Sequence, residues 1–178
     1  MKALTILLAA LAAVATWVVF GPPLERPQAA PPLGYLAAKG DAFFAASFKQ
    51  IGSSVVPLQT LRGKPVVAYF WASWCAKCRE ELKAVQALQD QYRDRGLVVV
   101  GFGIDQVDRI ERFAREAGID YPVFAGGPAA IALSKRMGNL REEMPFAVAI
   151  DREGLAAASR LGEFEPATAQ ALAAAALR

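Results

Sequence analysis

The chain has 178 residues, with 20 Lys and Arg, 17 Asp and Glu and no His, which gives a formal net charge of +3. This length fits one compact domain with an appendage, and such a domain needs no metal or disulfide to bury its core. The basic residues form no run that would follow phosphates, so nucleic acid is not an expected partner. Without histidine the commonest general base and metal ligand is missing, and two cysteines alone are too few for a disulfide framework.

The beginning of the chain predicts a membrane segment, residues 1–20. Residues 3–20 form an apolar run that follows Lys2 and ends at Gly21, and 18 apolar residues are the minimum for a span. The basic side is expected to stay in the cytoplasm, which places the rest of the chain outside it. A cleaved signal peptide has a similar layout, but its apolar core is usually shorter and ends in a small-x-small site. We therefore favour an uncleaved N-terminal anchor over cleavage.

A spacer and a folded domain are expected after this segment. Residues 21–33 are a Pro-rich linker, with five prolines between positions 22 and 32, and this composition favours an extended, semi-rigid chain. Residues 34–178 are assigned to one domain. Residues 34–61 show no periodic pattern that predicts particular elements.

Strands and helices alternate in the remainder of the domain. Residues 64–71 are almost continuously apolar and β-branched, which predicts a central strand covered on both faces. Apolar residues at helical spacing predict four helices, at residues 76–92, 108–117, 128–137 and from 166 onward. Further strands are expected at residues 97–102, 122–124, 146–150 and 155–161. This order predicts an α/β domain with a central mixed β-sheet flanked by helices.

The two cysteines lie where the predicted central strand gives way to the first helix, a place where α/β sheets put their sites. The start of a helix favours an anion and Lys77 adds a positive charge, so Cys75 is expected to be a reactive thiolate. Cys78 is one turn further along and can close a disulfide with Cys75. The pair predicts a thiol–disulfide exchange cycle, in which one cysteine attacks and the other resolves the mixed disulfide. Such a cycle needs no cofactor.

Other uses of a C-x-x-C pair fit less well. A structural zinc site requires two further cysteine or histidine ligands, and the chain has none. Haem attachment requires histidine where Arg79 stands. A purely structural disulfide remains an alternative, although so short a loop would constrain the unfolded chain little.

The segment Tyr69 to Glu81, YFWASWCAKCREE, resembles the active-site segment of the TlpA/ResA branch of the thioredoxin superfamily. The resemblance runs from about residue 45 to the C-terminus and includes residues 61–65 and 144–154. It implies a thioredoxin-like fold with a helix and a strand inserted around residues 105–137. Members of this branch are typically anchored in the cytoplasmic membrane and face the periplasm or the cell exterior.

The resemblance also implies roles for four residues outside the cysteine pair. Pro145 would be the cis-proline that packs beside the cysteines and helps to hold extended substrate. Trp74 and Met144 would contribute to substrate binding. Glu81 would be the active-site glutamate, although by its position alone it would be an ordinary solvated helix carboxylate.

Two positions depart from the family pattern. Thioredoxin has a buried aspartate where this chain has Tyr69, so a carboxylate that moves protons at Cys78 is expected to be Glu81. Lys83 stands where the family often has a helix-kinking proline, which leaves the shape of the first helix open.

These features together predict an extracytoplasmic thiol–disulfide oxidoreductase that reduces disulfides in client proteins, such as those of cytochrome c or copper-site maturation. A membrane thiol carrier would supply the electrons. The helix start and Lys77 favour an oxidant, but the residues between the cysteines resemble the reductant branch, which predicts a potential nearer roughly −270 mV than −120 mV. The alternative is a metal-handling protein that binds Cu(I) through Cys75, Cys78 and Met144. The chain has only three methionines, which argues against a dedicated copper carrier.

Overall fold

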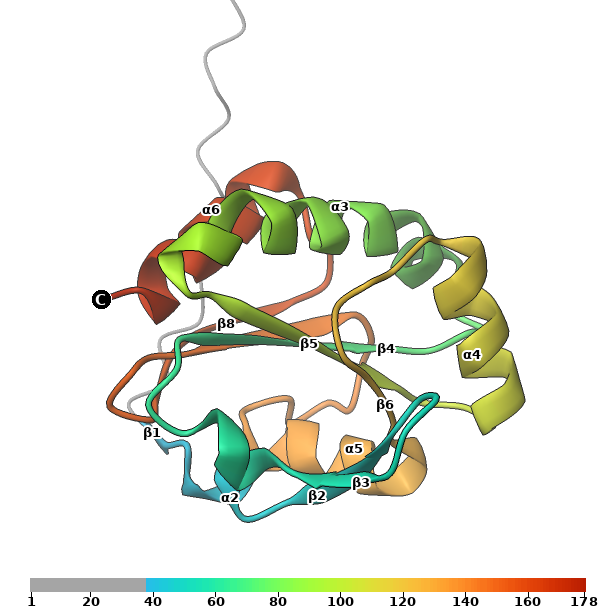
Figure 1. Ribbon diagram of the computed structural model, residues 1–178, viewed down its shortest axis with the longest axis horizontal. Helices are drawn as coiled ribbons and strands as arrows, with labels where there is room; N and C mark the ends of the chain where they lie inside the picture. Colours follow the sequence, from blue (N-terminus) through green and yellow to red (C-terminus); the bar gives the residue numbers. More distant parts are fainter. Residues whose placement is uncertain (1–37) are drawn as a thin grey trace, which may run out of the picture.

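The computed structural model describes residues 38–178 (Figure 1). The expected anchor (residues 1–20), the whole expected linker (residues 21–33) and the first four residues of the expected domain lie outside the described residues. Between Ala38 and Arg178, no helix is long and apolar enough to cross a membrane.

Within residues 38–178, eight strands form one sheet in the order β1-β8-β7-β4-β5-β6-β2-β3. The strands are β1 (Ala38–Lys39), β2 (Ser47–Gln50), β3 (Val55–Pro57), β4 (Val66–Trp71), β5 (Val98–Gly103), β6 (Val123–Ala125), β7 (Phe146–Ile150) and β8 (Leu155–Leu161). The helices are α2 (Asp41–Phe44), α3 (Ala76–Tyr92), α4 (Val107–Glu116), α5 (Gly127–Arg136) and α6 (Pro166–Ala176), with short 3-10 turns η1 (Leu58–Leu61) and η2 (Arg93–Arg95).

The sheet is mixed, as predicted. β4 lies near its centre, where it pairs in parallel with β5 and antiparallel with β7. β5 and β6 are also parallel, whereas the remaining pairs are antiparallel. All six residues of β4 are buried, as a continuous apolar run requires when helices cover both faces of a strand.

Successive side chains of β4 point to opposite faces of the sheet and enter two separate apolar clusters. Val67, Tyr69 and Trp71 belong to the cluster that also contains buried residues of α3, α4 and α6. Phe70 and its neighbours on the other face pack with residues of α2 and α5. Figure 1 shows this arrangement, with α3 and α6 on one side of the sheet and α2 and α5 on the other.

The predicted elements agree with the structure to within one or two residues. Helix α3 spans Ala76–Tyr92 without interruption at Lys83, so the helix continues where the family often has proline. The strands β7 and β8 have the predicted bounds. The stretch without a prediction, residues 34–61, contains β1, α2, β2, β3 and η1 within its described part.

Candidate active site

Cys75 and Cys78 form a disulfide with an S–S distance of 2.06 Å and a Cα–Cα distance of 5.3 Å. Cys75 is the N-cap residue of α3, and its Sγ accepts a hydrogen bond of 3.1 Å from the Cys78 backbone N–H. Cys78 is fully buried, whereas Cys75 is only partly buried. The amino end of a helix stabilises a thiolate. Cys75 is therefore the more accessible of the two cysteines and lies where a thiolate is favoured.

The loop that carries the cysteines is fixed on both sides by backbone hydrogen bonds. Cys75 N–H donates to the Ala72 carbonyl at 3.1 Å, which closes the turn after β4. Ile104 N–H donates to the Trp71 carbonyl at 2.8 Å, which ties the end of β4 to the end of β5. The cysteines thus follow the carboxyl end of a central strand, where the sequence placed them.

Asp105 holds the same loop from the side of α4. The Ser73 hydroxyl donates to one carboxylate oxygen of Asp105, and Gln106 N–H donates to the other at 2.6 Å. The hydrogen bond from Ser73, and to a smaller extent that from Gln106, holds the pKa of Asp105 below its ordinary value. The Arg109 guanidinium lies 3.7 Å from the same carboxylate. Sequence reasoning missed the Ser73–Asp105 contact, for which no local pattern gives a signal.

Glu81 lies one turn beyond Cys78 on α3, and both of its carboxylate oxygens accept hydrogen bonds. The Tyr69 hydroxyl donates to Oε2 at 2.8 Å, and the Phe164 backbone N–H donates to Oε1 at 2.9 Å. Residues three apart on a helix are neighbours on one face, so Glu81 and the buried Cys78 share a face of α3. Glu81 is therefore oriented by three elements, β4, α3 and the β8–α6 loop, and is not a freely solvated side chain.

Tyr69 supplies a buried hydroxyl at the position where thioredoxin has a carboxylate. The side chain is fully buried. Burial first, and then the neighbouring Glu81 carboxylate, raise the pKa of Tyr69 well above its ordinary value. The hydroxyl consequently stays protonated and acts as a hydrogen-bond donor to Glu81.

Lys77, between the two cysteines, forms an ion pair with Glu163 in the β8–α6 loop. The same loop reaches the strand that begins after Pro145, since Gly162 N–H donates to the Pro145 carbonyl at 2.9 Å. The positive charge expected beside Cys75 therefore has a carboxylate partner. The contact with Glu163 joins residues that are 86 positions apart, and no sequence pattern links them.

The three residues expected to contact substrate lie around the cysteine loop. Trp74 is 69% exposed and lines a cavity of about 320 Å³ together with the β5–α4 loop and the start of α5. The Met144–Pro145 peptide bond is cis, as the resemblance implies, and Pro145 is buried. Met144 and Cys75 are both partly buried and pack against the same two apolar clusters. Because Phe146 pairs with Phe70, Met144 and Pro145 lie at the end of β4 that leads into the cysteine loop.

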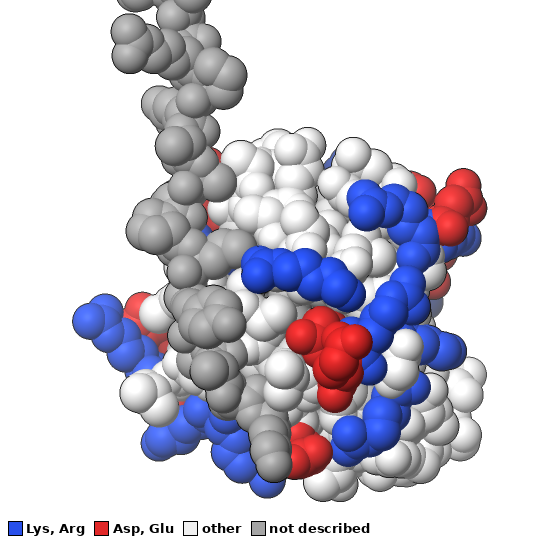
Figure 2. Space-filling model, turned by 90° about the vertical axis from the view of Figure 1, so that its left-hand side faces the viewer, with Lys and Arg blue, Asp and Glu red and all other residues white. Residues whose placement is uncertain are grey.

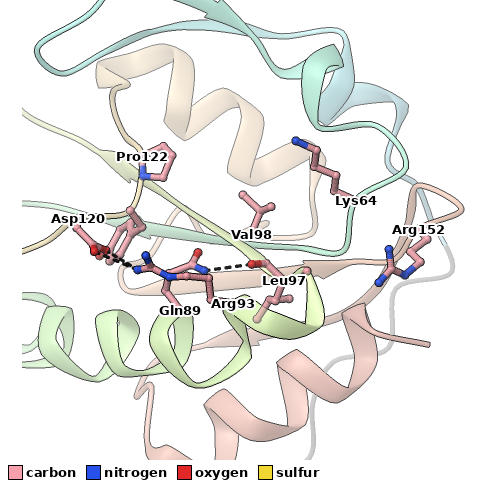
Figure 3. Close-up of a pocket in the computed structure, with 10 residues that line it drawn as sticks. Lys64, Gln89, Arg93, Leu97, Val98, Asp120, Pro122 and Arg152 are labelled. Carbon is pink, nitrogen blue, oxygen red and sulfur yellow. Dashed lines mark hydrogen bonds and ion pairs between the residues drawn. The ribbon is translucent and has the colours of Figure 1, made fainter.

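A second cavity, of about 550 Å³, lies at the other end of the parallel strands (Figure 3). Its lining includes Lys64, just before β4, and Pro122, just before β6. Within it, Arg93 pairs with Asp120 at 3.0 Å. Because this cavity opens at the amino ends of the strands, it is separate from the cysteine site. Figure 2 shows the end of the molecule on the left in Figure 1, where Lys and Arg side chains lie among Asp and Glu side chains.

Over residues 38–178, no group of three or more His, Cys, Asp or Glu side chains is placed to hold a metal ion.

The mixed sheet is flanked by helices, and the cysteine pair lies at the start of the helix that follows the central strand. These features place this protein in the class of thioredoxin-like proteins. The AhpC/TSA family model matches residues 40–162, and the chain belongs to that family.

Relatives and solved structures agree with this assignment. The thiol-disulfide oxidoreductase ResA of Bacillus thuringiensis (strain Al Hakam) is 27% identical over 109 residues, which cover 61% of this chain and 61% of that relative. A thiol:disulfide interchange protein of the thioredoxin family from Chlorobium tepidum TLS superposes with a TM-score of 0.68 at 22% identity, covering 83% of this chain and 100% of that one. A secreted thiol-disulfide isomerase from Corynebacterium glutamicum superposes with a TM-score of 0.67 at 19% identity, covering 89% of this chain and 94% of that one.

These matches confirm two predictions. The relatives named ResA confirm the resemblance to the TlpA/ResA branch, and the solved structures confirm the thioredoxin-like fold with its mixed sheet flanked by helices. The match to ResA of B. thuringiensis spans less than two thirds of that protein's length.

Proposed function

We propose that this protein is a thiol–disulfide oxidoreductase that cycles Cys75 and Cys78 between dithiol and disulfide. The observation that carries the proposal is the disulfide at the start of α3, with an accessible Cys75 and a fully buried Cys78. In the reducing direction the Cys75 thiolate attacks a client disulfide, which forms a mixed disulfide and releases one client thiolate. Cys78 then attacks the Cys75 sulfur and releases the second client thiolate. Two electrons pass to the client, and the Cys75–Cys78 disulfide forms again.

Glu81 is the proposed proton acceptor for Cys78 in the second step. Its two hydrogen bonds hold the carboxylate on the face of α3 that carries Cys78, and a positioned carboxylate can take the proton of a thiol that must become nucleophilic. Glu81→Gln keeps the shape of the side chain but removes this capacity. We expect slower exchange, with a larger change in the titration of Cys78 than of Cys75; an unchanged rate and titration would reduce Glu81 to a structural role.

Trp74, Met144 and Pro145 are the proposed client-binding residues. Support comes from the exposure of Trp74 and from the place of Met144 beside the apolar clusters that Cys75 also contacts. A client polypeptide bound here would have its disulfide next to Cys75, the only one of the two cysteines that is not fully buried.

The proposed setting is outside the cytoplasm. The apolar segment 1–20 would anchor the protein to the cytoplasmic membrane, the Pro-rich linker 21–33 would act as a spacer, and residues 34–178 would form the catalytic domain. The C. glutamicum structure is described as that of a secreted protein, which supports this setting. Clients would be proteins with disulfides, such as those of cytochrome c or copper-site maturation, and a membrane thiol carrier would be the electron donor.

The test is an exchange assay with the full chain in detergent. The reduced protein is expected to reduce insulin disulfides and, after equilibration with glutathione mixtures, to give a potential nearer roughly −270 mV than −120 mV. The alternative function, Cu(I) binding by Cys75, Cys78 and Met144, predicts tight copper binding by the reduced protein and little disulfide reduction. A protein that binds Cu(I) but leaves insulin oxidised would contradict the oxidoreductase proposal.

A further inference from the structure

The charge between the two active-site cysteines is paired. Lys77 is the second of the two residues that separate Cys75 from Cys78, and its ammonium group contacts the carboxylate of Glu163. Both side chains are about half exposed, 49% for Lys77 and 47% for Glu163. The pair therefore lies at the surface at the first turn of α3, the turn that begins at the partly exposed Cys75.

A cation at this place would favour the reduced protein. Cys75 as a thiolate carries its charge at the start of α3, so a free ammonium group on Lys77 would stabilise it. Stabilising the thiolate stabilises the dithiol form and makes the couple more oxidising. A carboxylate paired with the same ammonium group acts in the opposite direction, because it repels the thiolate and cancels much of the field of the lysine.

We propose that Glu163 is a positioning residue for the redox reaction, which acts through Lys77 to make the Cys75–Cys78 couple more reducing. The inference rests on the proposed function and adds a residue that tunes its potential. The pairing offsets part of the tendency of a lysine between the cysteines to favour an oxidant.

Hydrogen bonds to the backbone on both sides of Glu163 fix the position of its loop. On one side of Glu163, Gly162 N–H donates to the Pro145 carbonyl at 2.9 Å, and on the other, Phe164 N–H donates to Glu81 at 2.9 Å. The Arg160 Nε donates to the Glu163 backbone carbonyl at 3.4 Å. Two of these bonds reach other parts of the active site, so the loop position is fixed independently of the ion pair.

Glu81, Asp105 and Arg79 have partners of their own, and the Arg79 guanidinium lies 5.3 Å from the centroid of the Phe113 ring. Glu81 accepts from Tyr69 and Phe164, and Asp105 accepts from Ser73 on the side of the loop towards α4. Arg160 contacts the backbone of Glu163 and not its carboxylate. Removing the Glu163 charge therefore changes the surroundings of Lys77 more than those of the other groups.

The experiment is a charge cycle in the full-length protein, with Glu163→Gln, Lys77→Gln and the double variant equilibrated against glutathione. We expect Glu163→Gln to shift the equilibrium constant about threefold towards the dithiol, a size that suits a half-exposed charge in water. For a two-electron couple a threefold change is about 14 mV. Lys77→Gln should shift the constant by a similar factor towards the disulfide, and the double variant should return close to the parent.

The pKa of Cys75, measured by the pH dependence of its alkylation, should be lowest in Glu163→Gln and highest in Lys77→Gln. Glu165→Gln is the matched control, because Glu165 is exposed in the same loop and forms no ion pair among the described residues; it should leave the potential within a few millivolts of the parent. A merely structural role for Glu163 predicts lower stability with an unchanged potential and Cys75 pKa, and that result would overturn the inference. If the parent itself fails to exchange with glutathione, the proposed function fails instead.

Discussion

Tyr69 and Tyr121 are buried tyrosines in the same apolar cluster, but their hydroxyl groups have different surroundings. Tyr69 donates to the Glu81 carboxylate at 2.8 Å. The Tyr121 hydroxyl has no hydrogen-bond partner within the described part of the chain. A hydrogen bond to a charged group contributes more than one between neutral groups, whereas an unpaired buried hydroxyl contributes nothing favourable.

We therefore predict that Tyr69→Phe lowers the free energy of unfolding by about 1.5–3 kcal/mol, whereas Tyr121→Phe changes it by less than about 0.5 kcal/mol. Urea denaturation of the oxidised protein measures both. In a Glu81→Gln background the loss from Tyr69→Phe should shrink, because the acceptor is no longer charged. Equal losses for the two tyrosines would show that the Tyr69–Glu81 bond does not stabilise the fold.

At this scale, the sequence allowed only part of the site to be predicted. Cys75 and Cys78 were identified by their spacing and by the strand-to-helix context, and Glu81 by resemblance alone. The contacts that orient these residues join Ser73 to Asp105, Lys77 to Glu163 and Glu81 to Phe164, across 32, 86 and 83 positions. Such pairs are set by the packing of whole elements, which a local pattern does not encode.

At the scale of the elements, the long segments were predicted and most of the short ones were not, with the three-residue β6 as the exception. Helix α3 has 17 residues and β8 has seven, enough for several periods of their apolar pattern. The elements of the unpredicted stretch have two to four residues each, fewer than the pattern needs. Their positions depend on partners elsewhere, as when β1 pairs with β8.

Among these short elements, α2 contributes two large aromatic side chains to the core. Phe43 and Phe44 are almost fully buried, and Phe43 packs edge-on against Phe102 of β5 with ring centroids 6.2 Å apart. Gly40 N–H also donates to the Gly154 carbonyl at 2.8 Å, which fixes the entry to α2 beside the β7–β8 turn.

This packing tests the proposed domain boundary. A chain that starts at residue 34 should unfold cooperatively, because it keeps all the described elements. A chain that starts at residue 46 should be far less stable, since truncating one buried phenylalanine alone costs about 3–5 kcal/mol. Thermal unfolding by circular dichroism compares the two, and equal melting temperatures would place the boundary of the domain after α2.

At the scale of the whole molecule, the buried tyrosines make stability depend on alkaline pH. Burial raises the pKa of Tyr121, and burial together with Glu81 raises that of Tyr69, far above the ordinary value of 10.0. Below pH 10 both tyrosines are protonated in the folded and unfolded states, so they add no pH dependence. Above it, the unfolded chain loses protons that the folded protein retains, and stability falls.

The expected slope is about 1.4 kcal/mol per pH unit for each of the two tyrosines once the pH exceeds 10. Urea denaturation of the oxidised protein at several pH values above 10 measures it. The double variant Tyr69→Phe/Tyr121→Phe is the control and should lose this part of the slope. A slope that is the same in both proteins would assign the alkaline loss of stability to other groups.

The central claim, that Cys75 attacks client disulfides and Cys78 resolves them, is tested most directly by trapping mixed disulfides in cells. With Cys78→Ser, the accessible Cys75 can attack but nothing releases the client, so covalent complexes should accumulate and disappear on reduction. With Cys75→Ser, the remaining Cys78 is fully buried, and few complexes should form. Non-reducing gels of the two variants, followed by identification of the trapped proteins, give the comparison. Equal trapping by both variants, or by neither, would contradict the account.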